Sequence, residues 1–199
     1  MKKLFFTLTI IAFSAGGVFA QGISGGLKVG ANFANQKFSG DGLDISPDSR
    51  TSMHLGLFLT AMVSETFGIQ PELMYNSVGS KFDLLGNELL QKLDYLTIPV
   101  MLRYQPVSVF HIHAGPQFGL LLSAKSEYDG DSQDTKEDYK GMDLGVGIGA
   151  GVDLPMGLGI SARYVMGLSN IAESEDPDEE GTLKNNAIQL SITYKIFGK

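Results

Sequence analysis

Apolar and polar residues alternate with a period of two along most of the chain beyond residue 20. In the segment 54–63, Leu55, Leu57 and Leu59 take every second position, and His54, Gly56 and Thr60 are among the residues at the alternate positions. Successive side chains of a β-strand point to opposite faces, so such a segment is typical of a strand with one wholly apolar face. The alternation predicts eight strands, at 26–33, 54–63, 67–76, 95–104, 110–122, 142–153, 158–168 and 187–197.

The second face of these strands is rich in glycine and carries only isolated charges. A soluble sandwich would instead show water a face rich in Lys, Glu and Thr. Small side chains suit the interior of a narrow closed barrel, and apolar-out, polar-in segments of about ten residues are typical of membrane barrels. The pattern predicts an all-β protein, an eight-stranded antiparallel up-and-down transmembrane β-barrel. A periplasmic lipocalin-like barrel, with its apolar face inward, is the alternative.

The connections between the predicted strands alternate in length, as they do when one rim of a barrel meets the periplasm and the other faces outside. Placing both termini in the periplasm makes the long links extracellular loops. The long polar links are 36–52, 83–92, 127–140 and 172–183, and the short ones are 64–67, 105–108 and 154–157.

The first twenty residues have a different pattern. Lys2 and Lys3 precede the short apolar run 4–13, and small residues lead up to Ala20. This order predicts a Sec-type signal peptide over 1–20, removed before Gln21. A membrane anchor is the weaker alternative because the apolar run is short. We therefore expect 21–199 to be one exported barrel domain.

Composition excludes several classes of function. The 199 residues include 15 basic and 22 acidic side chains, a net charge of −7, which argues against a nucleic-acid-binding face. The absence of cysteine excludes disulfides, Cys-ligated zinc and thiol catalysis. Much of the acidity falls in two predicted loops, 127–140 and 172–183. The second loop holds Glu173, Glu175, Asp176, Asp178, Glu179 and Glu180. Their spacing matches no calcium-binding loop, so a solvated acidic loop is the preferred interpretation, with divalent-cation binding left open.

Four charged residues fall on the polar faces of the predicted strands. Glu72 and Arg103 lie on neighbouring strands, as do Asp143 and Arg163. We expect ion pairs that fill the lumen, because a buried charge without a partner is costly. A switchable plug or a proton path is the functional alternative.

Histidine is the other candidate for chemistry. His111 and His113 share one strand face, a spacing that can chelate a metal. No third ligand is evident, so we expect no metal, cofactor or catalytic site here. The alternative is a barrel enzyme, of hydrolase or acyltransferase type, that uses His54 and loop carboxylates.

Aromatic residues support the membrane interpretation. Four tyrosines fall on the apolar faces, where girdle residues meet the membrane interface: Tyr75, Tyr104, Tyr164 and Tyr194. The last strand ends in Ile196 and Phe197, an aromatic ending of the kind that barrel-insertion machinery recognises.

Several segments together resemble one known family. GLKVGANFAN, PELMYNSVGSKF, YLTIPVMLRY, HAGPQFGLLL, DLGVGIGAGVDL, ARYVMGLSNI and NNAIQLSITYKIF occur in this order over nearly all of 21–199. They resemble the PorT-like outer-membrane β-barrel family of Bacteroidetes, which is porin-like in name. The resemblance implies an eight-stranded barrel in the cell outer membrane. One branch of that family is implicated in assembling a secretion machinery.

We therefore expect a non-enzymatic integral outer-membrane barrel with a structural, surface-interaction or small-partner binding role through its acidic loops. Eight strands leave no open aqueous pore. The expected partners are the lipid bilayer, the barrel-insertion machinery during biogenesis and an envelope protein, with no nucleic acid. A barrel enzyme and an accessory component of a secretion machinery are the alternatives.

Overall fold

The computed structural model describes residues 22–40, 43–45, 47–84, 87–129, 131–173 and 181–198. The predicted signal peptide, 1–20, lies outside the described residues. Of the acidic run only Glu173 is inside, while Glu175, Asp176, Asp178, Glu179 and Glu180 lie outside. Within the described ranges no helix has both the length and the hydropathy that a membrane crossing requires.

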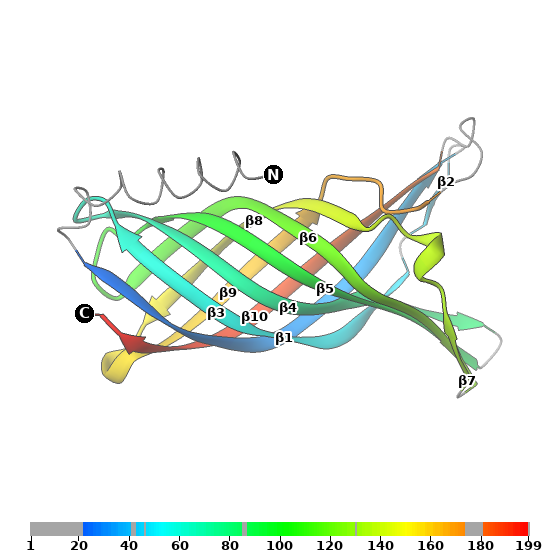
Figure 1. Ribbon diagram of the computed structural model, residues 1–199, viewed down its shortest axis with the longest axis horizontal. Coiled ribbons are helices and arrows are strands. Elements are labelled where there is room, and N and C mark those ends of the chain that lie inside the picture. The colour runs from blue at the N-terminus through cyan, green and yellow to red at the C-terminus, as the bar shows by residue number, and fades with distance from the viewer. Residues whose placement is uncertain are drawn as a thin grey trace, which may run out of the picture.

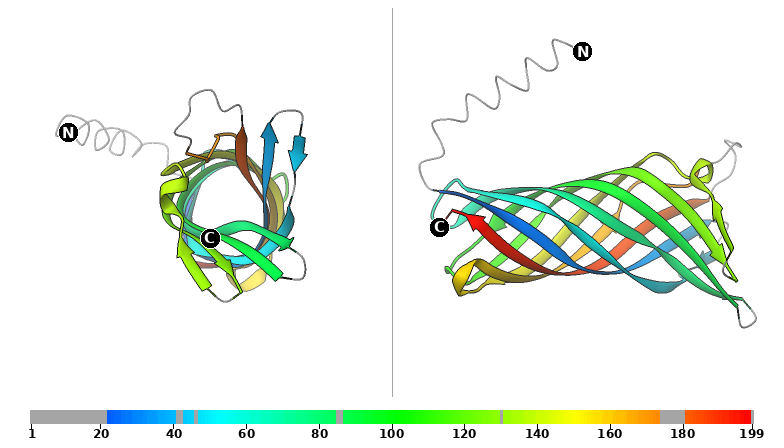
Figure 2. Two further views of the ribbon diagram at one scale, coloured as in Figure 1. Left: turned by 90° about the vertical axis from the view of Figure 1, so that its right-hand side faces the viewer. Right: turned by 60° about the horizontal axis from the view of Figure 1, so that its bottom comes forward.

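Eight long antiparallel strands form a closed ring (Figures 1 and 2). Neighbours along the chain pair with one another, and the last strand pairs with the first. The ring comprises β1 (Ile23–Gly40), β3 (Asp48–Met62), β4 (Phe67–Leu84), β5 (Asn87–Tyr104), β6 (Phe110–Tyr128), β8 (Met142–Asp153), β9 (Leu158–Gly167) and β10 (Thr182–Phe197). Two short strands are added outside it, β2 (Leu43–Ile45) on β1 and β7 (Asp131–Asp134) on β6. The predicted fold class is confirmed.

The strand registers fix the shape of the barrel. Following paired residues from Leu55 through β4 and β5 leads to Leu120 on β6. Following them the other way, through β1, β10, β9 and β8, leads to Phe110 on the same strand. The stagger is ten residues, which tilts the strands by about 40° and leaves an interior that side chains can fill.

The two faces of the wall are sorted by polarity. Outward side chains form a continuous apolar band in which Leu57, Leu102 and Ile192 are all more than half exposed. Most of the inward side chains are polar and buried, among them Lys28, Glu72 and Arg163. This inversion of the soluble pattern places the lipid against the outer wall.

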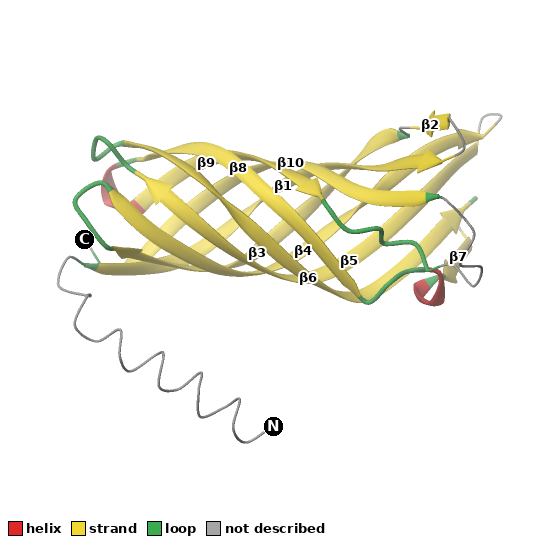
Figure 3. Cartoon of the chain, turned by 90° about the horizontal axis from the view of Figure 1, so that it is seen from above, coloured by secondary structure: helices red, strands yellow, loops and turns green. Residues whose placement is uncertain are grey.

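The two ends of the barrel differ. One, here called the short-turn end, carries the connections 63–66, 105–109 and 154–157, the last of which includes η4 (Pro155–Gly157). The other, here called the extended end, carries β2, β7 and η3 (Lys136–Asp138) (Figures 1 and 3).

Strands at the extended end run further than the sequence indicates. The predicted ten-residue loop 83–92 is wrong, since β4 and β5 remain paired as far as Leu84 and Asn87. The predicted link 36–52 is likewise shortened by β1 and β3. Polar residues such as Lys92 and Asp94 on the outer face hid these extensions, because a strand beyond the lipid needs no wholly apolar outer face.

A small apolar cluster closes the interior near the extended end. Val78, Leu93 and Leu121 pack there with other buried residues, Ala34, Tyr95, Ala124 and Ala187. Tyr139, which follows η3, packs against the cluster and donates a hydrogen bond to Gln91 Oε1 at 3.2 Å. Burial raises the pKa of the Tyr139 hydroxyl. Tyr139 therefore fixes the segment after η3 against the apolar cluster at this end of the barrel.

The four predicted girdle tyrosines lie on the outer face at different depths. Tyr104 and Tyr194 lie close to the short-turn end, where β5 and β10 finish. Tyr75 lies further toward the extended end and hydrogen-bonds Asp94. Tyr164 also faces outward, opposite Ile148 on β8 and Ile188 on β10, and its place in a girdle stays a prediction. Alternation identifies the face of a residue but not its depth.

Candidate functional site

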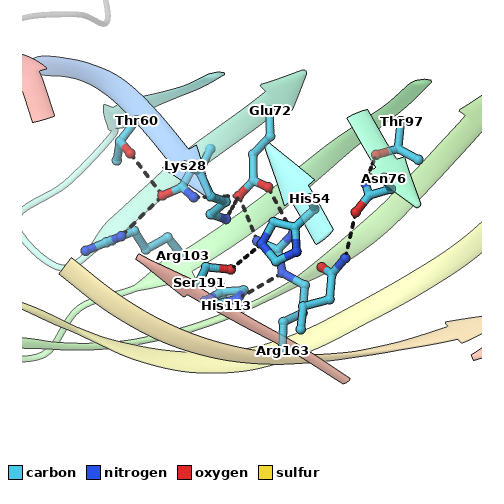
Figure 4. Close-up of polar contacts among 12 residues, drawn as sticks. Lys28, His54, Thr60, Glu72, Asn76, Thr97, Arg103, His113, Arg163 and Ser191 are labelled. Carbon is cyan, nitrogen blue, oxygen red and sulfur yellow. Dashed lines mark hydrogen bonds and ion pairs between the residues drawn. The ribbon is translucent and has the colours of Figure 1, made fainter. Parts of the chain in front are cut away.

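A buried carboxylate, Glu72, is the centre of the charged interior (Figure 4). Lys28 on β1 donates to Glu72 Oε1 at 2.6 Å. Arg163 on β9 holds both carboxylate oxygens, Nη2 to Oε1 at 2.7 Å and Nη1 to Oε2 at 3.0 Å. All three side chains are buried. Three strands that are not neighbours are thus joined through one bidentate, charge-assisted contact and one lysine contact.

Neutral side chains complete this cluster. Gln70 donates to Glu72 Oε1 at 2.7 Å, and Arg163 Nε donates to His113 Nε2 at 3.1 Å. Because His113 Nε2 accepts that hydrogen bond, the ring is neutral with its proton on Nδ1. The cluster therefore contains two cations and one anion, and among the described residues Glu72 alone compensates its buried positive charge.

The predicted pairing of Glu72 with Arg103 is wrong. The β4–β5 register places Arg103 opposite Gly68, nearer the short-turn end than Glu72. Arg103 instead pairs with Asp153 at that end and donates to Gln70 Oε1 at 3.2 Å.

The predicted pairing of Asp143 with Arg163 is also wrong. Arg163 stands opposite Gly149, while Asp143 lies further along β8 toward the extended end. Asp143 accepts hydrogen bonds from Ser169 and Asn185, both at 2.9 Å.

The sequence interpretation missed Lys28, which is the second cation at Glu72. Its alternating position between Leu27 and Val29 was the available signal, because an inward lysine in a narrow barrel requires an acidic partner.

His54 hydrogen-bonds two polar neighbours, one through each ring nitrogen. Its Nδ1 lies 2.7 Å from Asn32 Oδ1. Its Nε2 lies 2.9 Å from Ser191 Oγ, a contact that Figure 4 shows. A hydroxyl, an imidazole and an amide in this order resemble a nucleophilic triad. However, His54 is 1% exposed and Ser191 is 5% exposed, so a substrate carbonyl cannot reach the hydroxyl. The geometry favours an interior hydrogen-bond network.

Amide side chains continue the network toward the extended end. Gln189 donates to Asn32 at 3.1 Å and to Asn76 at 3.0 Å, and Asn76 donates to Thr97. Two small interior cavities flank the charged cluster and this network. One, of about 30 Å³, lies toward the extended end, and the other, of about 10 Å³, lies beside Arg103, His111 and His113. Volumes this small hold one or two water molecules and do not form a channel.

His111 and His113 lie side by side in the short-turn half, with ring centroids 5.5 Å apart. Both are buried, and the Nδ1 atom of each has no hydrogen-bond partner among the described residues. Nowhere among the residues that the structure describes are three His, Cys, Asp or Glu side chains arranged to hold a metal.

Glycines on the inner face make room for the large polar groups. A Cβ atom at Gly30 would lie 2.7 Å from the His54 ring, and one at Gly149 would lie 2.7 Å from His113 Nε2. Glycines on the inner face therefore leave the space that the His54 and His113 rings occupy.

We expect Gly149→Ala to destabilise the barrel by about 1–3 kcal/mol, because its Cβ would also lie 2.3 Å from the Ala162 carbonyl oxygen. Gly141→Ala is the matched control, since nothing lies within 4 Å of its Cβ position. Urea unfolding of the two variants in lipid vesicles measures the difference. Equal stability of the two would contradict the tight fit at Gly149.

Comparison with known proteins gives the family. The chain matches the family model described as an outer membrane protein beta-barrel domain over residues 19–173. A search of curated proteins found no match. Two solved barrels are similar, each with a TM-score of 0.51. Ail, the attachment invasion locus protein of Yersinia pestis, is 15% identical, with 88% of this chain and 98% of that chain covered. Neisserial surface protein A is 12% identical, with 85% and 97% covered.

Identities this low show a shared fold, which agrees with the ring of eight strands and the apolar outer wall described above. The family match spans well over half of the chain and includes every strand of the ring except β10. The chain therefore belongs to the outer membrane protein beta-barrel domain family, and it lies in the lipid bilayer of the outer membrane.

Proposed function

We propose that this protein is a closed, non-enzymatic barrel that binds a partner through its extended end. One observation carries the proposal: the interior is filled along its length, while β4, β5 and β6 continue well beyond the apolar band. These strands have 18 or 19 residues. About ten residues suffice to cross the membrane, so roughly eight remain on each, a protrusion of about 20 Å.

The outer face of this protrusion is polar and suits contact with water or a polar partner. Ser77, Lys92, Asp94, Lys125 and Glu127 lie there, and Lys92 pairs with Glu127. By the usual orientation of such barrels, short turns face the periplasm, so the extended end faces the outside. The acidic link 127–140 belongs to the same end. The sequence that joins β9 to β10, 172–183, is acidic as well, and acidic links would favour a basic partner.

The closed interior predicts that the protein conducts no solutes. Purified barrel in phospholipid vesicles should cause no swelling with small sugars and no steady ion current in planar bilayers. An open trimeric porin in the same vesicles is the positive control. Swelling at a rate proportional to the amount of barrel would favour transport and overturn the proposal.

Binding at the extended end is tested by site-specific photocrosslinking on intact cells. A photoreactive residue at Gln133, exposed on β7, should give a discrete crosslinked product. The same residue at Leu57, in the lipid-facing band, is the matched control. A variant that joins Gly79 directly to Lys92, which face each other across the β4–β5 ladder, should lose the product while still inserting into the membrane. Identical products from all three proteins would contradict binding at the extended end.

A barrel hydrolase remains the competing class, and burial of Ser191 argues against it. Ser191→Ala should therefore leave any ester hydrolysis by the purified protein unchanged.

The finer family placement is part of the proposal. The ordered motifs from GLKVGANFAN to NNAIQLSITYKIF support membership of the PorT-like barrels of Bacteroidetes, and with it a second candidate role as an accessory of a secretion machinery. Deleting the gene and measuring the proteins released into the medium tests that role. Unchanged release would exclude it.

A further inference from the structure

The cavity of about 30 Å³ toward the extended end has an unusual chemical lining. It lies under the apolar cluster, next to Tyr95, and is bordered by side chains from six strands. Gln117 on β6, Asp143 on β8 and Asn185 on β10 contribute oxygen atoms, and Gly119, Gly145 and Gly167 leave the space open.

Two buried hydrogen-bond acceptors border this cavity without a partner among the described residues. Asn185 is 7% exposed, and its Nδ2 donates to Asp143 Oδ2 at 2.9 Å and to Tyr95 Oη at 3.3 Å. Its Oδ1 atom is buried and has no partner among the described residues. The Oε1 atom of Gln117 is also buried and without a partner there. Two orphaned acceptors therefore border the same small space.

The carboxylate beside them has no counter-charge. Asp143 accepts a hydrogen bond from Ser169 at 2.9 Å as well as from Asn185. Among the described residues it forms no ion pair, unlike Glu72 and Asp153. A largely buried carboxylate without a cation is costly, and hydrogen bonds from neutral groups offset only part of that cost.

We propose that this cavity binds a monovalent cation, Na⁺ or K⁺, through oxygens of Asp143, Gln117 and Asn185. One carboxylate balances one positive charge, and carboxylate and amide oxygens are the ligands that hard cations prefer. The volume suits one ion with a bound water. Asp143 remains partly exposed, which gives the ion a route from the extended end. A water molecule alone would satisfy the two orphaned acceptors but would leave the carboxylate uncompensated.

Such an ion would join β6, β8 and β10 near the extended end, where the described residues make one side-chain contact between these strands, from Asn185 to Asp143. At the other end Lys195 on β10 pairs with Asp153 on β8. The expected consequence is a salt-specific stability. The melting temperature of the purified, refolded barrel in detergent should be higher in NaCl or KCl than in choline chloride at equal ionic strength, by about 3 °C. Equal ionic strength makes general screening the same in both salts. Choline is too large for the cavity, so it cannot replace the bound ion.

The matched variants are Asp143→Asn and Asp131→Asn. The first removes the carboxylate from the cavity, and the second removes an exposed carboxylate from β7. The difference between sodium or potassium and choline should vanish in Asp143→Asn and persist in Asp131→Asn. Equal shifts in both variants, or no shift in the native chain, would overturn the proposal.

A direct measurement on the native chain does not depend on whether the variants refold. Crystals of the native full-length chain soaked in Tl⁺, an anomalous scatterer that replaces K⁺, should show a peak among the three oxygen ligands. Ordered water without an anomalous peak would show that the cavity is a hydration site only.

Discussion

Glu72→Gln is expected to destabilise the barrel by about 3–5 kcal/mol, because it leaves two buried cations without an anion. Lys28 and Arg163 both bind this carboxylate within 3.0 Å, and both are buried. Urea unfolding in lipid vesicles, followed by far-ultraviolet circular dichroism, measures the loss.

Glu127→Gln is the matched control. Glu127 pairs with Lys92 on the outer surface, where both side chains are about one-third exposed. A solvated pair of this kind contributes about 0–1 kcal/mol. The double variant Lys28→Met with Glu72→Gln should cost less than the sum of the two single changes, because it removes one of the stranded cations. Additive losses, or equal losses for Glu72→Gln and Glu127→Gln, would show that the cluster does not hold the barrel together.

Leu57→Arg is expected to cost about 2–4 kcal/mol, because it places a charge near the middle of the apolar band. Leu57 is 53% exposed to the lipid side and pairs with Leu27 and Leu73. Folding yield and unfolding free energy in vesicles measure the effect.

Met142→Arg tests whether the cost of an outward arginine depends on its depth in the membrane. Met142 also faces outward and is 60% exposed, but it is the first residue of β8, at the outer edge of the band. Arginine there reaches the headgroups, and a cost of about 0–1 kcal/mol is expected. Equal costs at the two positions would contradict the depth assigned to the wall.

The fold could be predicted from the sequence because lipid requires the same alternation along every strand. Each predicted segment lies within a strand of the ring, apart from a terminal residue such as Val63 or Leu168, since an apolar face of about ten residues is the condition for crossing. The strand extensions at 77–84 and 87–94 could not be predicted in this way. Their outer faces stand in water, where polar residues are tolerated, and their inner faces mix apolar residues such as Val78 and Leu93 with polar ones.

The interior could be predicted in composition but not in pairing. Glu72, Arg103, Asp143 and Arg163 all point inward, yet none of the four pairs with the partner that strand adjacency favoured. Pairing across a narrow barrel depends on register and on contacts through the lumen, such as that between β4 and β9. A slip of two residues keeps every side chain on its face and still changes every partner.

The seam between β1 and β10 has a consequence for how the barrel is made. The strand synthesised first in the ring pairs, over residues 25–39, with the strand synthesised last. Closure therefore waits for the whole ring to be translated, and contacts of such long sequence separation form slowly. Until then β1 and β9 each present an open edge that can pair with another chain. We expect a nascent chain that ends before Thr182 to aggregate or be degraded, so that the cell must hold this protein unfolded until its final strand arrives.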